Sequence, residues 1–210
     1  EGRAGDDVRE QMKIHKITEG AEREAFAQGL RQSPERTAHR GVRPVLMPAY
    51  YNENEPKAAA WLRALIAAGH ITPGDVDERS ITDVQPSDLV GFTQCHFFAG
   101  IGGWSYALRL AGWPDDRPIW TGSCPCQPFS GAGQGGGHTD ARHLWPEFFR
   151  LIQKCRPPVV AGEQVASRLG RYWLAAVRAD LETLGYAVGA ADLCAASVGA
   201  PHIRQRLYWV

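Results

Sequence analysis

The chain has 210 residues, 44% hydrophobic and 22% charged, a balance typical of a globular protein with one principal core. Lysine plus arginine and aspartate plus glutamate number 23 each, so the formal net charge is +0 and any contact with a polyanion must be local. No apolar run is long enough to cross a bilayer, the polar start is not a secretory signal, and an odd count of 5 cysteines argues against a disulfide framework, so we expect a cytoplasmic location.

The chain divides into two parts by composition. Residues 1–43 are polar and charged with scattered apolar positions, and we expect a partly disordered arm there. Residues 44–210 carry the periodic apolar segments of one domain. Because the apolar residues 207–210 have no exit turn after them, we expect the parent protein to continue beyond Val210.

The first half of the domain alternates between strand and helix patterns. A short strand is expected over 45–51, and Pro56 then starts a helix that Gly69 ends. Residues 94–98 form the next expected strand, followed by a glycine-rich turn and a helix that begins at Trp104.

The second half repeats the same alternation. A strand over 118–121 leads toward Cys126, and a helix follows around Pro146. Residues 159–162 form a strand that leads into Glu163, another helix follows, and residues 186–188 begin the last sheet segment. The pattern predicts an α/β fold with a Rossmann-like, doubly wound, mostly parallel sheet. Ligands bind such sheets at the carboxyl ends of the strands.

The segment 122–130, Gly-Ser-Cys-Pro-Cys-Gln-Pro-Phe-Ser, holds a cysteine between prolines that fix its geometry. From this segment alone two interpretations stand equal: Cys126 is a nucleophile, or Cys124 and Cys126 are a buried pair or half of a metal site. The remaining cysteines have no paired spacing, which argues against a zinc site, and we expect no metal.

Four sequence blocks occur in a fixed order: FAGIGG at 98–103, PCQPFS at 125–130, EQV at 163–165 and PHIRQR at 201–206. With these blocks the chain resembles the cytosine-5 DNA methyltransferases. The resemblance implies S-adenosylmethionine as cofactor and double-stranded DNA as substrate, with the target cytosine flipped out of the duplex. It also implies that the chain ends before the family's target-recognition domain, so activity of this chain alone is uncertain.

The resemblance assigns roles to residues by matching positions. Cys126 is implied as the nucleophile that attacks cytosine carbon-6, Glu163 as the acid at ring nitrogen-3, and Arg204 and Arg206 as the arginines that border the base. The implied cofactor residues in the glycine-rich block are Phe98, Ala99, Gly100, Ile101, Gly102 and Gly103. The implied substrate and loop residues are Gln127, Ser130, Gln134, Arg142 and Gln164. Three positions depart from the family pattern, namely His143, Gln164 and His202.

The family's two acidic cofactor residues do not occupy their usual place between the glycine-rich block and the cysteine. Upstream, Glu53 lies in a segment similar to the ribose-binding block, and Asp75 lies in one similar to the adenine-binding block. We therefore expect a local permutation, with two strands that precede the glycine-rich block in sequence but keep their usual places in the sheet. The alternative is that Glu53 is a helix N-terminal acid and Asp75 a turn residue.

Three other functions stay open. The chain could be a catalytically incomplete remnant that binds DNA or cofactor, an enzyme that methylates cytosine in RNA, or an oxidoreductase on the same sheet. The oxidoreductase leaves the PCQPFS block and Glu163 unexplained. A monomer is expected, with a restriction endonuclease as a companion, and restriction, phage protection and an orphan role are equally compatible with the sequence.

Overall fold

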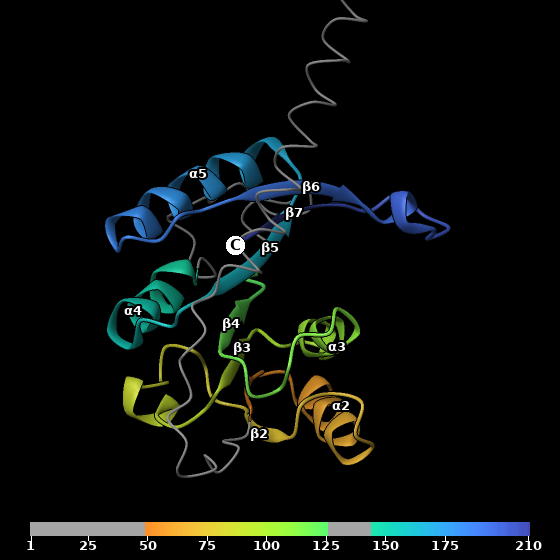
Figure 1. Cartoon of the computed structure of the whole chain (residues 1–210), viewed down its shortest axis with the longest axis vertical. Helices are drawn as coiled ribbons and strands as arrows, with labels where there is room; N and C mark the ends of the chain where they lie inside the picture. The colour runs from red at the N-terminus through yellow and green to blue at the C-terminus, as the bar shows by residue number, and fades with distance from the viewer. Residues whose placement is uncertain (1–48, 126–143) are drawn as a thin grey trace, which may run out of the picture.

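The computed structural model describes residues 49–125 and 144–210 (Figure 1). The predicted arm over 1–43 lies outside the described residues. So do Cys126, Gln127, Ser130, Gln134 and Arg142.

The described residues form one seven-stranded sheet in the order β2-β1-β3-β4-β5-β7-β6. The strands are β1 (Ala49–Asn52), β2 (Gly74–Asp77), β3 (Gln94–Phe97), β4 (Ile119–Gly122), β5 (Val160–Val165), β6 (Ala190–Cys194) and β7 (Gln205–Trp209). All pairings from β2 to β5 are parallel, whereas β7 is antiparallel to both β5 and β6. The predicted α/β fold with a mostly parallel sheet is confirmed.

Helices cover both faces of this sheet (Figure 1). Helices α2 (Pro56–Ala67) and α3 (Gly103–Leu110) lie on one face, and α4 (Trp145–Cys155) and α5 (Arg168–Thr183) lie on the other. Two short 3-10 helices, η1 (Pro86–Leu89) and η4 (Ala195–Val198), lie in connections. No helix in the described ranges is long and apolar enough to cross a membrane.

The start of α2 follows the sequence expectation. Pro56 occupies the first turn, where its missing N–H leaves no intrahelical bond unmade, and the carboxylate of Glu55 accepts a hydrogen bond from the Ala58 N–H at 2.7 Å. Past the helix, Gly69 adopts a φ of 72°, which a residue with a side chain rarely does. Pro56 and Gly69 therefore bound the helix as predicted.

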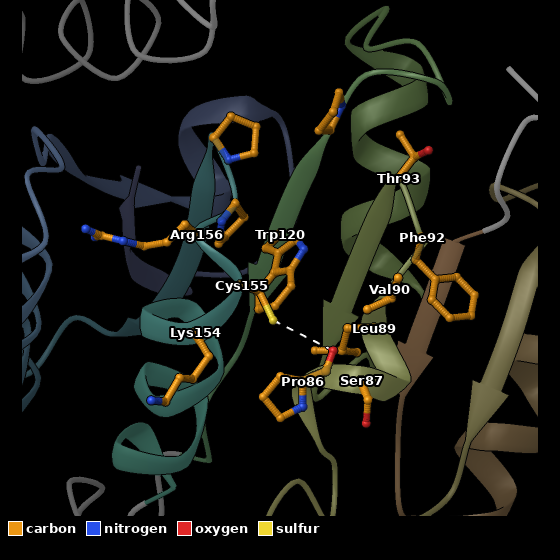
Figure 2. Close-up of a pocket in the computed structure, with 13 residues that line it drawn as sticks. Pro86, Ser87, Leu89, Val90, Phe92, Thr93, Trp120, Lys154, Cys155 and Arg156 are labelled. Carbon is orange, nitrogen blue, oxygen red and sulfur yellow. Dashed lines mark hydrogen bonds between the residues drawn. The ribbon is translucent and has the colours of Figure 1, made fainter.

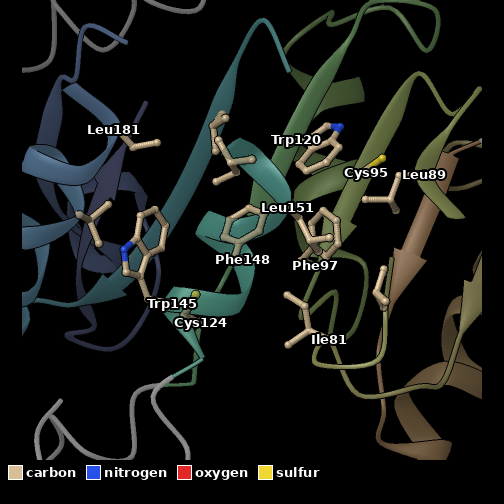
Figure 3. Close-up of a cluster of buried hydrophobic side chains, with 14 of the residues drawn as sticks. Ile81, Leu89, Cys95, Phe97, Trp120, Cys124, Trp145, Phe148, Leu151 and Leu181 are labelled. Atoms are coloured by element: carbon tan, nitrogen blue, oxygen red, sulfur yellow. The ribbon is translucent and has the colours of Figure 1, made fainter. Parts of the chain in front are cut away.

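The main hydrophobic core lies between the sheet and helices α4 and α5 (Figure 3). Phe97 packs against Trp120 and Phe148, with ring centroids 5.1 and 4.9 Å away. Helix α4 approaches β4 closely because Gly122 has no side chain: a Cβ there would lie 2.3 Å from Phe148 Cε1. This packing fixes the carboxyl end of β4, from which the chain continues to Cys126.

The sheet order agrees with the predicted permutation. Strand β1 pairs with β2 on one side and with β3 on the other, although both β1 and β2 precede β3 in the sequence. The strand that directly precedes Glu53 therefore lies beside the strand that leads to the glycine-rich turn.

The prediction for the last part of the sheet was wrong in its details. Residues 186–188 are not a strand, and the final sheet segment begins instead at Ala190. Strand β7 lies between β5 and β6. Because η4 and Gly199, whose φ is 92°, turn the chain back, β6 and β7 form an antiparallel pair.

Candidate active site

The glycine-rich turn sits at the carboxyl end of β3 and is held in a strained shape. Phe98 has a φ of 52°, an unusual value for a residue with a side chain, and such a conformation costs about 1–3 kcal/mol. Gly100 and Gly102 also have positive φ values, 55° and 80°. The Ala99 N–H donates to the Asn52 carbonyl at 3.0 Å, so the end of β1 holds the turn in place.

Glu53 joins the end of β1 to this turn. Its Oε2 accepts a hydrogen bond from the Gly100 N–H at 2.7 Å, and its Oε1 accepts one from the Glu55 N–H at 2.9 Å. The structure thus brings Glu53 to the glycine-rich turn, as expected for two parts of one binding site.

A small cleft of about 80 Å³ lies beside Glu53. Its lining residues are Asn52, Glu53, Asn54, Ser80, Ile81, Phe98, Pro125 and Leu144. The side-chain amide of Asn52 donates to the Arg79 carbonyl at 2.8 Å and so fixes the segment that carries Ser80 and Ile81.

The structure places Asp75 elsewhere. Asp75 is exposed in the body of β2, opposite Tyr50, and it is not among the described residues that line this cleft. The residue at the carboxyl end of β2 is Asp77, whose carboxylate accepts from the Tyr50 hydroxyl at 2.7 Å and is paired with Arg79. The sequence analysis did not identify Ser80 and Ile81, because they carry no charge and belong to no motif. They come close to Glu53 only because β1 and β2 pair in the register Asn52↔Asp77.

A larger cleft of about 570 Å³ opens at the carboxyl ends of the central strands. It brings together the glycine-rich turn, the end of β4, β5 and β7. Its lining residues are Phe98, Ala99, Gly100, Ile101, Gly103, Trp104, Ala107, Ser123, Glu163, Arg204, Arg206 and Tyr208. Glu163, from one predicted block, and Arg204 and Arg206, from another, therefore share one cleft with the glycine-rich turn.

Glu163 and Arg206 form an ion pair inside this cleft, with Arg206 Nε 3.4 Å from Glu163 Oε2. Burial raises the pKa of the Glu163 carboxyl, and the positive charges of Arg206 and Arg204 oppose that shift only in part. Tyr208 lies directly across from Glu163 in the β5–β7 register, and its pKa is raised by burial and by the charge of Glu163. When such a carboxyl takes up a proton it can donate to a ring nitrogen, while the neighbouring guanidinium donates to an adjacent oxygen.

Gln164, the next residue of β5, points away from this cleft because side chains alternate along a strand. It is only 1% exposed. Its Oε1 accepts from the Val165 N–H at 3.0 Å, and its Nε2 has no partner in the part of the chain that the structure describes.

Cys124 is a core residue. It is 6% exposed and lies in the main hydrophobic cluster beside α4 (Figure 3), and burial raises the pKa of its thiol. Within 49–125 and 144–210, no three histidine, cysteine, aspartate or glutamate side chains are grouped to hold a metal ion.

A third cleft, of about 510 Å³, lies at the amino ends of the central strands (Figure 2). Its lining includes Thr93 and Pro118, which directly precede β3 and β4, and Pro158, which lies two residues before β5. Trp120 and Cys155 are also among its lining residues. None of the predicted catalytic residues that the structure describes lines it.

The C-5 cytosine-specific DNA methylase family model matches residues 113–210. Over 91 residues the chain is 36% identical to the type II methyltransferase M.AplI of Arthrospira platensis, covering 42% of this chain and 26% of that protein. Over 167 residues it is 26% identical to the type II methyltransferase M.HhaI of Haemophilus parahaemolyticus, covering 61% and 51%.

The match spans about a quarter of the length of the first of these relatives and about half of the second. A mutant DNMT2 of Spodoptera frugiperda aligns over 88% of this chain and 45% of its own, with 15% identity and a TM-score of 0.49. The matched region, residues 113–210, includes Glu163, Arg204 and Arg206, so these three residues lie in the part of the chain that is similar to the C-5 cytosine-specific DNA methylases.

Proposed function

We propose that the chain is a DNA (cytosine-5)-methyltransferase that transfers a methyl group from S-adenosylmethionine to carbon-5 of a flipped cytosine in double-stranded DNA. The observation that carries this proposal is the shared cleft of the glycine-rich turn with Glu163 and Arg206. The type II names of the relatives support a companion restriction endonuclease that cuts the same sequence when it is unmethylated.

The residues around the two neighbouring clefts fit S-adenosylmethionine by the chemistry of their side chains. The carboxylate of Glu53 would accept hydrogen bonds from the ribose hydroxyls, and Ser80 and Ile81 would border the adenine. The turn from Phe98 to Gly103 would border the methionine end, where the absence of side chains lets the backbone approach. When bound, the cofactor supplies a methyl group activated by its sulfonium.

The protein's own residues would prepare the base. The Cys126 thiolate adds to cytosine carbon-6, and the displaced electron pair moves toward ring nitrogen-3, where Glu163 gives a proton. Arg206 would hold the cytosine oxygen-2, with Arg204 beside it. After methylation, the nitrogen-3 proton returns to Glu163, solvent water takes the proton from carbon-5, and the bond from carbon-6 to Cys126 breaks with its electron pair returning to sulfur, which restores the aromatic ring.

The loop residues stay predictions. Gln127, Ser130, Gln134 and Arg142 are proposed to contact the substrate or its loop. The unpaired Nε2 of Gln164 supports a role for this amide in bracing the segment around Cys126.

The test is covalent trapping. Duplex DNA that contains 5-fluorocytosine should become joined to Cys126 in the presence of S-adenosylmethionine, because fluorine at carbon-5 cannot leave as a proton does. Peptide mapping by mass spectrometry identifies the attached residue. The same experiment with an RNA of matched sequence shows whether DNA or RNA is the acceptor. An adduct at another residue, or none although calorimetry detects bound cofactor, overturns the proposal.

The Glu53→Gln substitution is expected to weaken S-adenosylmethionine binding about tenfold, because a neutral amide accepts hydrogen bonds from hydroxyls less strongly than a carboxylate does. Titration calorimetry without DNA measures the Kd. Glu78→Gln is the matched control, since Glu78 pairs with Arg63 at 2.7 Å outside the two clefts. Equal affinity of Glu53→Gln and wild type would remove Glu53 from the cofactor site.

A further inference from the structure

Trp104 has contacts that the proposed reaction does not yet use. It directly follows Gly103 at the start of α3 and lines the larger cleft. Its indole Nε1 donates a hydrogen bond to the Ser123 hydroxyl at 2.9 Å. A partly buried indole N–H needs an acceptor, so this bond fixes the orientation of the ring.

Ser123 begins the segment that leads from β4 to Cys126. Its backbone N–H donates to the carbonyl of Phe97, the last residue of β3, at 3.4 Å. The next residue, Cys124, is buried in the core on the other face. Ser123 is therefore held by β3 through its backbone and by α3 through its side chain.

The ring of Trp104 also contacts β7, the strand that carries Arg206. Its centroid lies 6.0 Å from that of Tyr208, with an angle of 77° between the ring planes, which is the favourable edge-to-face arrangement. Tyr208 is the register partner of Glu163 on β5. Trp104 thus contacts, on one side, the segment that leads to the proposed nucleophile, Cys126. On the other side it contacts β7, which pairs with the strand that carries the proposed acid, Glu163.

We propose that Trp104 is a positioning residue that fixes Ser123, where the segment leading to Cys126 begins, relative to Glu163 on the neighbouring strand of Tyr208. This inference rests on the proposed function. A displacement of reacting groups by about 1 Å can slow a reaction about a hundredfold, so a single contact of this kind has a measurable effect.

The Trp104→Phe substitution keeps an aromatic side chain at this position but removes the N–H donor together with part of the indole ring. The Ser123→Ala substitution removes the acceptor of the same bond. Each is expected to slow formation of the 5-fluorocytosine adduct about tenfold, and the double variant should be no slower than either one because both break one contact. Ser123→Thr, which keeps a hydroxyl, should recover most of the rate.

The matched control is Trp113→Phe. The Trp113 indole also donates to an acceptor, the Arg117 carbonyl at 3.0 Å, but Trp113 does not line the larger cleft. We expect Trp113→Phe to lower the melting temperature at least as much as Trp104→Phe and to leave the adduct rate unchanged.

The outcomes separate the two proposals. No adduct with wild-type protein and an intact Cys126 overturns the proposed function, and this inference with it. A wild-type adduct that forms at an unchanged rate in Trp104→Phe and Ser123→Ala overturns the positioning role alone. An equal slowing in Trp113→Phe also overturns it, because the effect would then come from general destabilisation.

Discussion

The Glu163→Gln substitution is expected to slow methyl transfer to DNA by about 10²–10⁴-fold, the usual contribution of a positioned acid. Glutamine has nearly the same shape and can still donate a hydrogen bond, but it cannot give a proton to ring nitrogen-3. Cofactor affinity should change little, because Glu53 and the glycine-rich turn are intact. Single-turnover transfer of a labelled methyl group, alongside calorimetry with S-adenosylmethionine, measures the two effects separately.

The pH dependence gives a second readout for Glu163. Because burial raises the pKa of this carboxyl, the protonated form persists to higher pH than for an ordinary glutamate. The wild-type rate should therefore fall as the pH rises through that raised pKa, and Glu163→Gln should lack this alkaline decline. Glu182→Gln is the control, since Glu182 pairs with Arg178 on the exposed surface of α5. A wild-type decline that persists in Glu163→Gln would assign the titration to another group.

The Gly162→Ala substitution is expected to lower the free energy of unfolding by about 1–3 kcal/mol, as overpacking of a dense core does. A Cβ at Gly162 would lie 2.2 Å from Trp209 Cζ2 and 2.7 Å from the Gly122 carbonyl oxygen. Trp209 is fully buried and its ring meets Trp145 edge-to-face at 5.8 Å, so it has little freedom to move aside. Chemical denaturation measures the stability.

The same change should also slow methyl transfer, because a shift of β7 away from β5 separates Arg206 from Glu163. Gly103→Ala is the control for stability: a Cβ there meets nothing within 4 Å, and alanine is favoured in a helix. We expect Gly103→Ala to be no less stable than wild type. If Gly162→Ala unfolds at the same denaturant concentration as wild type, the close approach of Trp209 to β5 is not rigid.

Local features of the fold were predictable because neighbours in sequence decide them. Pro56 starts a helix since its fixed φ suits a first turn, and Gly69 ends it by adopting a positive φ. The start of β6 was harder to predict. Residues 186–188 look like a strand by their apolar pattern, yet the backbone pairing with β7 and Val210 extends back only to Gly189.

The candidate site was likewise predictable only in part from the sequence. Glu163, Arg204 and Arg206 could be selected because charged residues in these blocks carry a family pattern, and the structure places all three in one cleft. Ser80 and Ile81 could not, because they are ordinary residues that reach Glu53 only through the pairing of β1 with β2. Asp75, selected because its segment is similar to the family's adenine-binding block, lies in the body of β2.

The amino-acid sequence by itself determined the chemical groups, the α/β alternation and the two strands placed ahead of the glycine-rich turn. Only the tertiary structure decided that β7 lies between β5 and β6, which brings Arg206 to within 3.4 Å of Glu163, and that Trp104 meets both Ser123 and Tyr208. The reason is physical: caps and turns depend on residues a few positions apart, whereas the separation of two side chains in a cleft depends on strand order and register, which are set by packing across the whole sheet.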